Sequence, residues 1–193
     1  MDPRIERTRN SVHHATLSVL GRVGYAAFTI EGVASEAGVA KSTIYRHWPT
    51  KLSLISDSLE LLNQQPRPDI DAENIRQQIR QLIEHLAQAF NDSLLSACIP
   101  ALIEAADQNP EVAKFLHTYS ARRRQTLVDT IQRGIDSGEL PHHLDAELTA
   151  LALSGPIIYN RTMTPKAMTS HQASQLVDMI LGKPSVGTSP TPS

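Results

Sequence analysis

Several kinds of functional site have little support in this sequence, because the residues that build them are missing. The 193-residue chain has one cysteine, Cys98, so it forms no internal disulfide and cannot build a zinc site from cysteines. Its eight histidines do not fall into the His-Glu-x-x-His spacing, and no Asp-rich calcium loop or glycine-rich phosphate loop occurs. We therefore expect no metal, no cofactor and no enzymatic activity.

Long apolar segments are also missing. No run approaches the ~18 apolar residues that a membrane-spanning helix needs. The N-terminal stretch MDPRIERTRN is polar from its start, unlike a secretory signal. The remaining composition, 40% hydrophobic and 20% charged, is typical of a soluble globular protein with a packed core. We expect a cytoplasmic protein with no membrane partner.

Charge is spread unevenly along the chain. The net charge is −2, but residues 1–51 contain seven Lys or Arg against four acidic residues, and residues 52–193 contain 11 against 16. This asymmetry indicates that the N-terminal part is the one that meets a polyanion. Aromatic residues are scarce, with four Tyr, three Phe and one Trp. Even so, the short stretch VAKSTIYRHWPTK (39–51) combines a Tyr and the Trp with several cations.

Apolar residues repeat mostly at intervals of three and four, and few segments alternate with a period of two. This pattern predicts an all-α protein of about nine helices. The two prolines in QQPRPD (64–69) mark the best domain boundary. We therefore predict an N-terminal domain over residues 1–65 and a C-terminal helical domain over residues 66–182. Residues 183–193 are rich in Pro, Ser and Thr, and are expected to form a disordered tail.

Residues 30–48 fit two short helices joined by a tight turn. Thr29 is a good N-cap for the first helix, and Gly38 can adopt the positive φ that ends it. Ile44 would turn back into the core, while polar side chains at the start of the second helix point outward. Such side chains, at a helix N-terminus, can donate to phosphates and base edges. This is the spacing of a helix-turn-helix DNA-binding motif.

Residues 28–55, FTIEGVASEAGVAKSTIYRHWPTKLSLI, resemble the N-terminal DNA-binding segment of the TetR family of repressors. The Tyr-x-His-Trp-Pro-x-Lys pattern (45–51) is the most specific part of the resemblance. Trp48 stands where phenylalanine is commoner, which is a benign exchange of aromatics. Ser53 stands where an acidic residue is common, which weakens a helix cap. Residues 138–163 resemble, more loosely, the regulatory domain of the family.

The resemblance implies DNA contacts at the matching positions. The residues implied as contacts to backbone phosphates or groove edges are Thr29, Thr43, Tyr45, His47 and Lys51. The residues implied as readers of bases are Lys41, Ser42 and Arg46, and an arginine can grip guanine in a bidentate way. Two interpretations stay open for Arg4, Arg7 and Arg9: an arm that reaches DNA, or a frayed, solvated terminus.

The C-terminal half offers a means of dimerisation. LTALALSGPII (148–158) is apolar on every side of a helix, so it must be buried on every side. We predict that its own core covers one side and a second subunit the other. The resemblance likewise implies a homodimer through helices near 148–161 and 171–182. A wholly intramolecular core helix is the alternative.

The helices between residues 73 and 137 are expected to hold a small-molecule effector. The candidate lining residues are Leu86, Phe90, Leu102, Ile103, Leu116, Tyr119 and Tyr159. For each of them, ordinary core packing is the competing explanation. Few charged residues fall on these apolar stripes, which favours an apolar or aromatic effector.

These features together predict a ligand-responsive DNA-binding regulator. We expect a repressor that binds a palindromic operator as a dimer, is released by a small molecule, and is associated with the nucleoid. The alternative is a ligand-sensing or protein-interaction module whose N-terminal domain has lost DNA binding. All the implied DNA contacts are present in the sequence, which favours the regulator.

Overall fold

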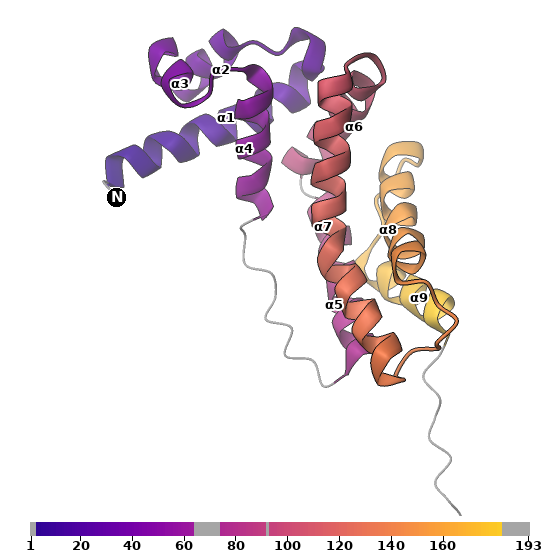
Figure 1. The fold of residues 1–193 in the computed structure, drawn as a ribbon. Helices are drawn as coiled ribbons and strands as arrows, with labels where there is room; N and C mark the ends of the chain where they lie inside the picture. The colour runs from indigo at the N-terminus through magenta and orange to yellow at the C-terminus, as the bar shows by residue number, and fades with distance from the viewer. Residues whose placement is uncertain (1–2, 64–73, 92, 183–193) are drawn as a thin grey trace, which may run out of the picture. The chain divides into compact units, whose positions relative to one another are not determined.

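The computed structural model describes residues 3–63, 74–91 and 93–182, and in these ranges every regular element is a helix (Figure 1). The described helices are α1 (Pro3–Ala27), α2 (Ile30–Ala37), α3 (Lys41–His47), α4 (Lys51–Asn63), α5 (Ile75–Asn91), α6 (Ser93–Gln108), α7 (Pro110–Ser137), α8 (Ala146–Met163) and α9 (Ser170–Leu181). The prediction of an all-α fold is confirmed. The predicted linker and tail lie outside the described residues.

The chain divides into two compact units that each draw on two stretches of sequence. Unit 1 comprises residues 1–69 and 89–126, and unit 2 comprises residues 70–88 and 127–193. Helices α1 to α4 therefore belong with α6 and the first part of α7. Helices α8 and α9 belong with most of α5 and the end of α7. The predicted domain division after residue 65 stays a prediction.

Unit 1 is built around α1, which packs against α2, α4 and α6. The inward stripe of α1 includes Val12, Val19 and Leu20, all of which are buried. The approach of α6 is close at Gly21, where an added Cβ would lie only 2.7 Å from the Cβ of Ala97. A larger residue at this position would push the two helices apart.

The start of α4 shows how one departure from the family pattern is accommodated. The Thr50 hydroxyl accepts from the backbone N–H of Ser53 at 3.1 Å, as expected of an N-cap. The Ser53 hydroxyl accepts in return from the backbone N–H of Thr50 at 3.2 Å. Serine therefore takes the place of the usual acidic residue in a reciprocal capping box.

Unit 2 contains a ladder of polar contacts between α5 and α9, which run antiparallel. Its rungs are Arg76 with the carbonyls of Leu181 and Gly182, Arg80 with Asp178, Glu84 with Ser174, and Gln88 with Ser170. Successive rungs lie about one helical turn apart along both helices. The ladder therefore fixes the register of α9 on α5.

Helix α8 lies beside α9 in unit 2 (Figure 1). Asp145 caps α8, since its carboxylate accepts from the backbone N–H of Leu148 at 2.7 Å. The inward face of α8 includes Ala150, Leu153 and Ile157, which are fully buried. This side of the helix forms part of the core of unit 2, as predicted.

No single described helix is long and apolar enough to cross a membrane, and one bent pair, α5 with residues 96–108 of α6, reaches the required length and composition only when taken together.

Candidate nucleic-acid interface

Helices α2 and α3 form a helix-turn-helix whose turn is fixed by local hydrogen bonds. At the start of α2 the Thr29 hydroxyl accepts from the backbone N–H of Gly32 at 3.1 Å. At its end Gly38 has φ 67° and ψ 33°, and its N–H donates to the carbonyls of Ala34 and Ser35. This left-handed conformation favours glycine because it has no Cβ. Both predicted caps of α2 are confirmed.

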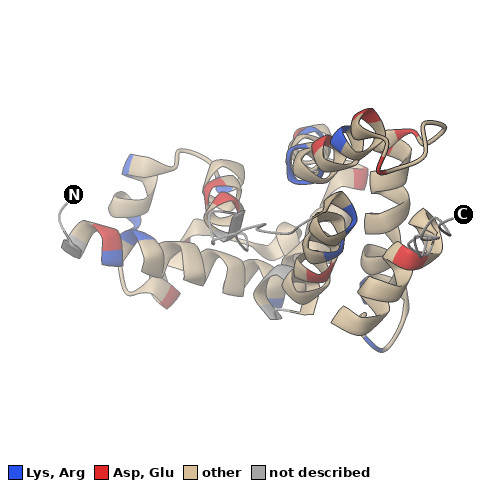
Figure 2. Ribbon diagram, turned by 90° about the horizontal axis from the view of Figure 1, so that it is seen from below, with Lys and Arg blue, Asp and Glu red and all other residues tan. Residues whose placement is uncertain are grey.

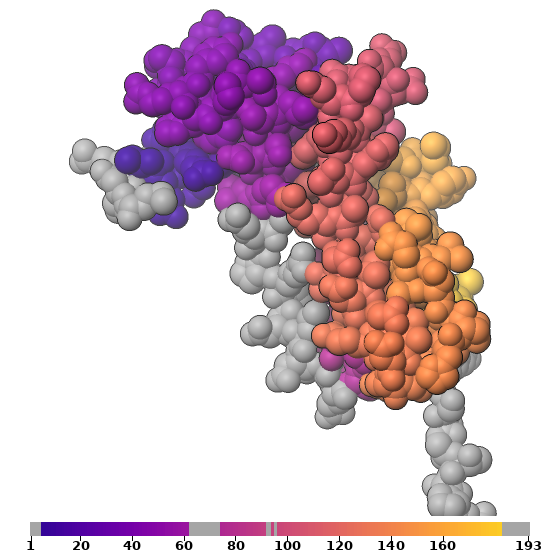
Figure 3. All heavy atoms as spheres, viewed as in Figure 1, coloured from indigo at the N-terminus to yellow at the C-terminus, as the bar shows by residue number. Residues whose placement is uncertain are grey.

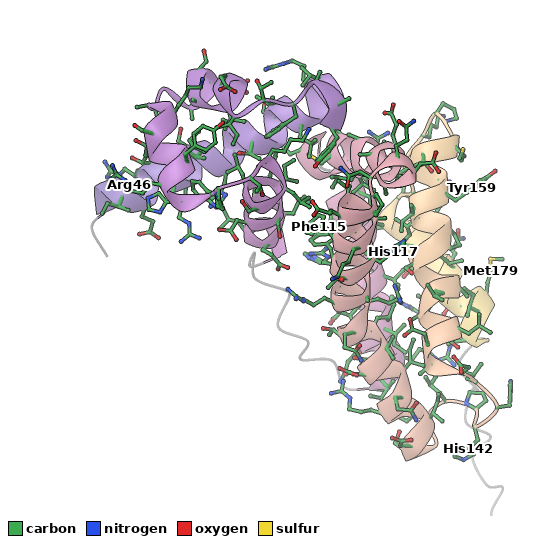
Figure 4. All side chains as sticks on the ribbon, turned by 45° about the horizontal axis from the view of Figure 1, so that its top comes forward. Arg46, Phe115, His117, His142, Tyr159 and Met179 are labelled. Carbon is green, nitrogen blue, oxygen red and sulfur yellow. The ribbon has the colours of Figure 1, made fainter. Side chains whose placement is uncertain are left out.

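Helix α3 is held by one side and exposes the other. Ile44 is fully buried, and Val33 of α2 is buried with it in unit 1. The exposed residues of α3 are Lys41, Ser42, Tyr45, Arg46 and His47, while Thr43 is partly buried. The atoms of this region lie at the surface in Figure 3, and Arg46 lies at the outer edge of unit 1 in Figure 4. The sequence-predicted contact residues of α3 therefore share one accessible surface.

The cations of unit 1 differ in their partners. Lys41 forms an ion pair with Glu31 at the start of α2. Arg22 forms an ion pair with Glu36 at 2.6 Å. Figure 2 shows acidic and basic residues interspersed on the helices of unit 1. The two ion pairs mean that part of the positive charge counted in the sequence is neutralised within the unit.

Lys51 is held in a different way. Its ammonium donates to the backbone carbonyl of Tyr25 at 3.1 Å and lies 4.0 Å from the centroid of the Tyr25 ring. Lys51 is the first residue of α4, as predicted, but its side chain is only partly exposed because it lies against the end of α1. This contact between α1 and α4 could not be read from the sequence.

Trp48, directly after α3, is the buried centre of a polar network that reaches the surface at Asp57 and Arg9. Its side chain is 5% exposed, and its indole N–H donates to the carboxylate of Asp57 in α4 at 2.9 Å. Arg9 of α1 also donates to this carboxylate, at 3.3 Å. The ring of His13 meets that of Trp48 edge-on, with centroids 5.2 Å apart. The network joins the end of α3 to both α1 and α4.

His13 is held as a neutral imidazole in this network. Its Nε2 accepts from the Nε of Arg9 at 3.3 Å, so the proton is on Nδ1, which donates to the Ser58 hydroxyl at 2.9 Å. Burial, and secondly the charge of Arg9, lower the pKa of His13 below 6.5, against a smaller opposing effect of Asp57. Sequence reasoning missed His13 and Asp57. The signal for His13 was its place beside Val12 on the inward stripe of α1.

The N-terminal arginines lie on a helix. Helix α1 already begins at Pro3, so Arg7 and Arg9 are not part of a frayed end, and their contact with DNA stays a prediction. Arg9 is directed back toward α4 by its ion pair with Asp57. The exposed Arg7 stays on the surface of α1, and the side chain of Arg4 lies outside the described part. The helix extends further toward the N-terminus than its apolar stripe, which is why the sequence left a frayed end open as an interpretation.

Family models match both parts of the chain. A model described as "Bacterial regulatory proteins, tetR family" matches residues 13–57, and one described as "Tetracyclin repressor-like, C-terminal domain" matches residues 69–180. This chain belongs to the TetR family. It is thus a helix-turn-helix DNA-binding transcriptional regulator and not an enzyme.

Relatives and solved structures agree with this membership. The chain is 30% identical over 180 residues to YdeS, an uncharacterised HTH-type transcriptional regulator of Bacillus subtilis, covering 91% of this chain and 88% of YdeS. It is 28% identical over 174 residues to AqdR, an HTH-type transcriptional regulator of Rhodococcus erythropolis, covering 89% and 84%. FadR of Bacillus halodurans, a fatty acid degradation regulator, shares the fold with a TM-score of 0.76 at 19% identity. The match covers 89% of this chain and 97% of FadR.

The residues predicted for the effector pocket of this TetR-family chain differ in exposure. Phe90, Leu102 and Tyr119 are buried, and Leu86 and Leu116 are partly buried. Ile103 and Tyr159 are 46% and 64% exposed. These two do not suit an enclosed pocket within one chain, because their side chains face outward. The pocket itself stays a prediction.

Large apolar side chains line the outer face of α8. The exposed residues there are Leu148, Leu151, Tyr159 and Met163, and on α9 Met179 is 80% exposed. Tyr159 and Met179 project outward from unit 2 in Figure 4. Gly155, in the middle of this face, has no atom within 4 Å of a built Cβ. The face opposite the buried side of α8 is therefore apolar, and nothing in the described part of the single chain covers it.

Among the described residues, no group of three or more His, Cys, Asp or Glu side chains could hold a metal ion. Cys98 is buried, and burial raises the pKa of its thiol to about 12. Its Sγ donates to the carbonyl of Leu17 at 3.3 Å. Cys98 is a packed residue of unit 1, as its place in an apolar stripe predicted.

Proposed function

We propose that this TetR-family regulator is a repressor that binds a palindromic operator as a homodimer and is released by a small apolar or aromatic molecule. The observation that supports DNA reading best is the exposed polar face of α3. The buried side chains of Ile44 and Trp48 hold the opposite side of this helix against unit 1. A protein that acts on chromosomal operators is expected to work in the cytoplasm, at the nucleoid.

The proposed DNA contacts divide into two groups by chemistry. The proposed backbone-phosphate or groove-edge contacts are Thr29, Thr43, Tyr45, His47 and Lys51. The proposed base readers are Lys41, Ser42 and Arg46. The exposure of Arg46 at the edge of unit 1 supports this role. Thr29 can serve as both cap and contact, because its oxygen accepts from Gly32 while its O–H remains a donor.

Salt-dependent binding to duplex DNA tests this proposal against a sensor that has lost DNA binding. We expect the wild-type affinity for random-sequence duplexes to fall steeply with salt, since cation–phosphate contacts release counterions. Arg46→Ala should weaken binding to a selected operator by about 1–3 kcal/mol and relax base preference at its position. Lys166→Ala, at an exposed lysine of unit 2, is the matched control and should bind like the wild type. Wild-type affinity that is absent or independent of salt would favour the sensor.

The proposed dimer uses the uncovered face of α8 with α9. One recognition helix covers few base pairs, so a two-fold dimer that presents two of them explains specificity and a palindromic operator. Leu148→Glu should convert a dimer to a monomer in sedimentation velocity. Ile103→Glu, at an exposed isoleucine on α6, is the control and should leave the mass unchanged. A wild-type monomer at high concentration would contradict the dimer.

The proposed effector is supported by the apolar character of the candidate lining residues. A structural neighbour at 21% identity and a TM-score of 0.74, FadR from Bacillus subtilis, was solved in complex with stearoyl-CoA. That ligand carries a long apolar chain, which agrees with an apolar effector here. A ligand lowers operator affinity only by its preference for the conformation that does not fit DNA. Release of the operator by apolar compounds, followed by fluorescence anisotropy, tests this step.

A further inference from the structure

The way Lys51 is held distinguishes it from its neighbours. Lys41, Arg22 and Arg9 each meet a carboxylate within unit 1. In the described part of the chain no carboxylate lies within ion-pair distance of Lys51, and its ammonium meets two groups of Tyr25, a carbonyl oxygen and a ring face. Both groups are electron-rich, and neither carries a charge. Tyr25 therefore orients the ammonium without neutralising it.

The ammonium keeps hydrogen-bonding capacity in this arrangement. A lysine has three N–H donors. One is directed to the Tyr25 carbonyl at 3.1 Å. The Tyr25 ring, whose centroid is 4.0 Å from the Nζ atom, covers a second side of the ammonium. The third donor is left for an outside acceptor. An anion such as a phosphate oxygen would then meet a full positive charge whose position is already set.

The local backbone explains why Tyr25 is available for this contact. Gly24 has φ 74° and ψ 172°, a conformation that favours glycine and breaks the regular course of α1. Tyr25 follows directly, in the last turn of α1, and its carbonyl accepts only a long hydrogen bond, 3.4 Å, from the backbone N–H of Phe28. Carbonyls at a helix C-terminus attract cations. Lys51 itself starts α4, where the helix dipole disfavours a cation. The carbonyl and ring of Tyr25 at the end of α1 therefore give the ammonium the favourable electrostatic interaction that the N-terminus of α4 lacks.

We propose that Tyr25 is a positioning residue for DNA binding, which holds Lys51 for contact with a backbone phosphate. The proposal rests on the proposed function, because it assumes that Lys51 meets DNA. A cation that is held in place loses less conformational freedom on binding than a free lysine side chain. Tyr25 should therefore strengthen DNA binding without touching DNA.

The test is a double-mutant cycle on the full chain with random-sequence duplex DNA at several salt concentrations. Lys51→Ala should reduce the salt slope by about one phosphate contact. Tyr25→Leu removes the ring and keeps the carbonyl, and should weaken binding about two- to ten-fold, the cost of ordering one long side chain on binding. In the Lys51→Ala background, Tyr25→Leu should have no further effect. Tyr25→Phe keeps the ring face and should bind like the wild type.

A structural role of Tyr25 gives different results. Equal losses from Tyr25→Leu with and without Lys51, or no loss at all, would overturn the proposal. If Tyr25→Leu does not fold, ring-fluorinated phenylalanines at position 25 replace it. These keep the shape but weaken the negative face of the ring, so affinity should fall with the degree of fluorination; a constant affinity would refute the role. Wild-type protein that shows no salt-dependent binding would instead refute the proposed function.

Discussion

Asp57→Ala provides the sharpest test of the network behind α3. The substitution leaves the buried indole N–H of Trp48 without its acceptor, which costs about 1–3 kcal/mol. It also removes the ion pair with Arg9, whose two side chains are 52% and 48% exposed, so this part is worth only about 0–1 kcal/mol. We expect unit 1 to lose about 2 kcal/mol of stability.

Urea unfolding followed by tryptophan fluorescence measures this loss directly. Trp48 is the only tryptophan of the chain, so its emission reports on unit 1. With an m-value of about 2 kcal/mol per M, the midpoint should fall by about 1 M in Asp57→Ala. Asp57→Asn keeps a carbonyl oxygen as acceptor and should recover most of the difference.

A control at another ion pair separates the network from surface charge. Glu31→Ala removes the partner of Lys41 in the same unit, where both side chains are 52% exposed, and should barely move the midpoint. If Asp57→Ala and Glu31→Ala unfold at the same urea concentration, the indole hydrogen bond does not stabilise unit 1. The reasoning on Trp48 would then be refuted.

Further predictions concern unit 1. Burial holds the pKa of His13 below 6.5, so the unfolded chain binds more protons than the folded one just below pH 6.5. The free energy of unfolding should therefore fall as the pH drops. His13→Leu should lose this dependence when urea midpoints are measured between about pH 5 and 8. Gly21→Ala places a Cβ 2.7 Å from that of Ala97 and should lower the free energy of unfolding by about 1–3 kcal/mol. Adding Ala97→Gly should restore this stability. No loss of thermal stability in Gly21→Ala would contradict the close approach. Glu31→Gln frees Lys41 and should raise affinity for random duplexes and steepen the salt slope, whereas weaker binding would contradict this.

Local features of the helix-turn-helix could be predicted from the sequence, because they depend on neighbouring residues. Thr29 and Gly38 act within three or four positions of their partners, so cap preference and backbone freedom identify them. Ile44 was identified as an inward residue by its spacing. Thr50 caps α4 by the same kind of local contact. The Ser53 hydroxyl also completes the capping box, a contact between residues only three positions apart.

Contacts between distant segments could not be predicted in this way. Trp48 was interpreted as a benign replacement for phenylalanine, although its N–H has a specific acceptor nine positions later. Lys51 was assigned to DNA alone, although it also lies on Tyr25, 26 positions earlier. Pattern and propensity describe single helices, whereas these contacts depend on how α1, α3 and α4 pack. The exposure of Ile103 and Tyr159 was missed for the same reason.

The rungs between α5 and α9 make sliding of α9 asymmetric. If α9 moved one turn in one direction, the carboxylates of Glu84 and Asp178 would face each other, and like charges at that distance repel. In the opposite direction Asp178 would face Arg76, and the charges would still match. The second movement still breaks the hydrogen bonds of Arg76 to the carbonyls of Leu181 and Gly182 and that of Gln88 to Ser170. It brings no like charges together, so electrostatic repulsion opposes displacement of α9 along α5 in one direction only.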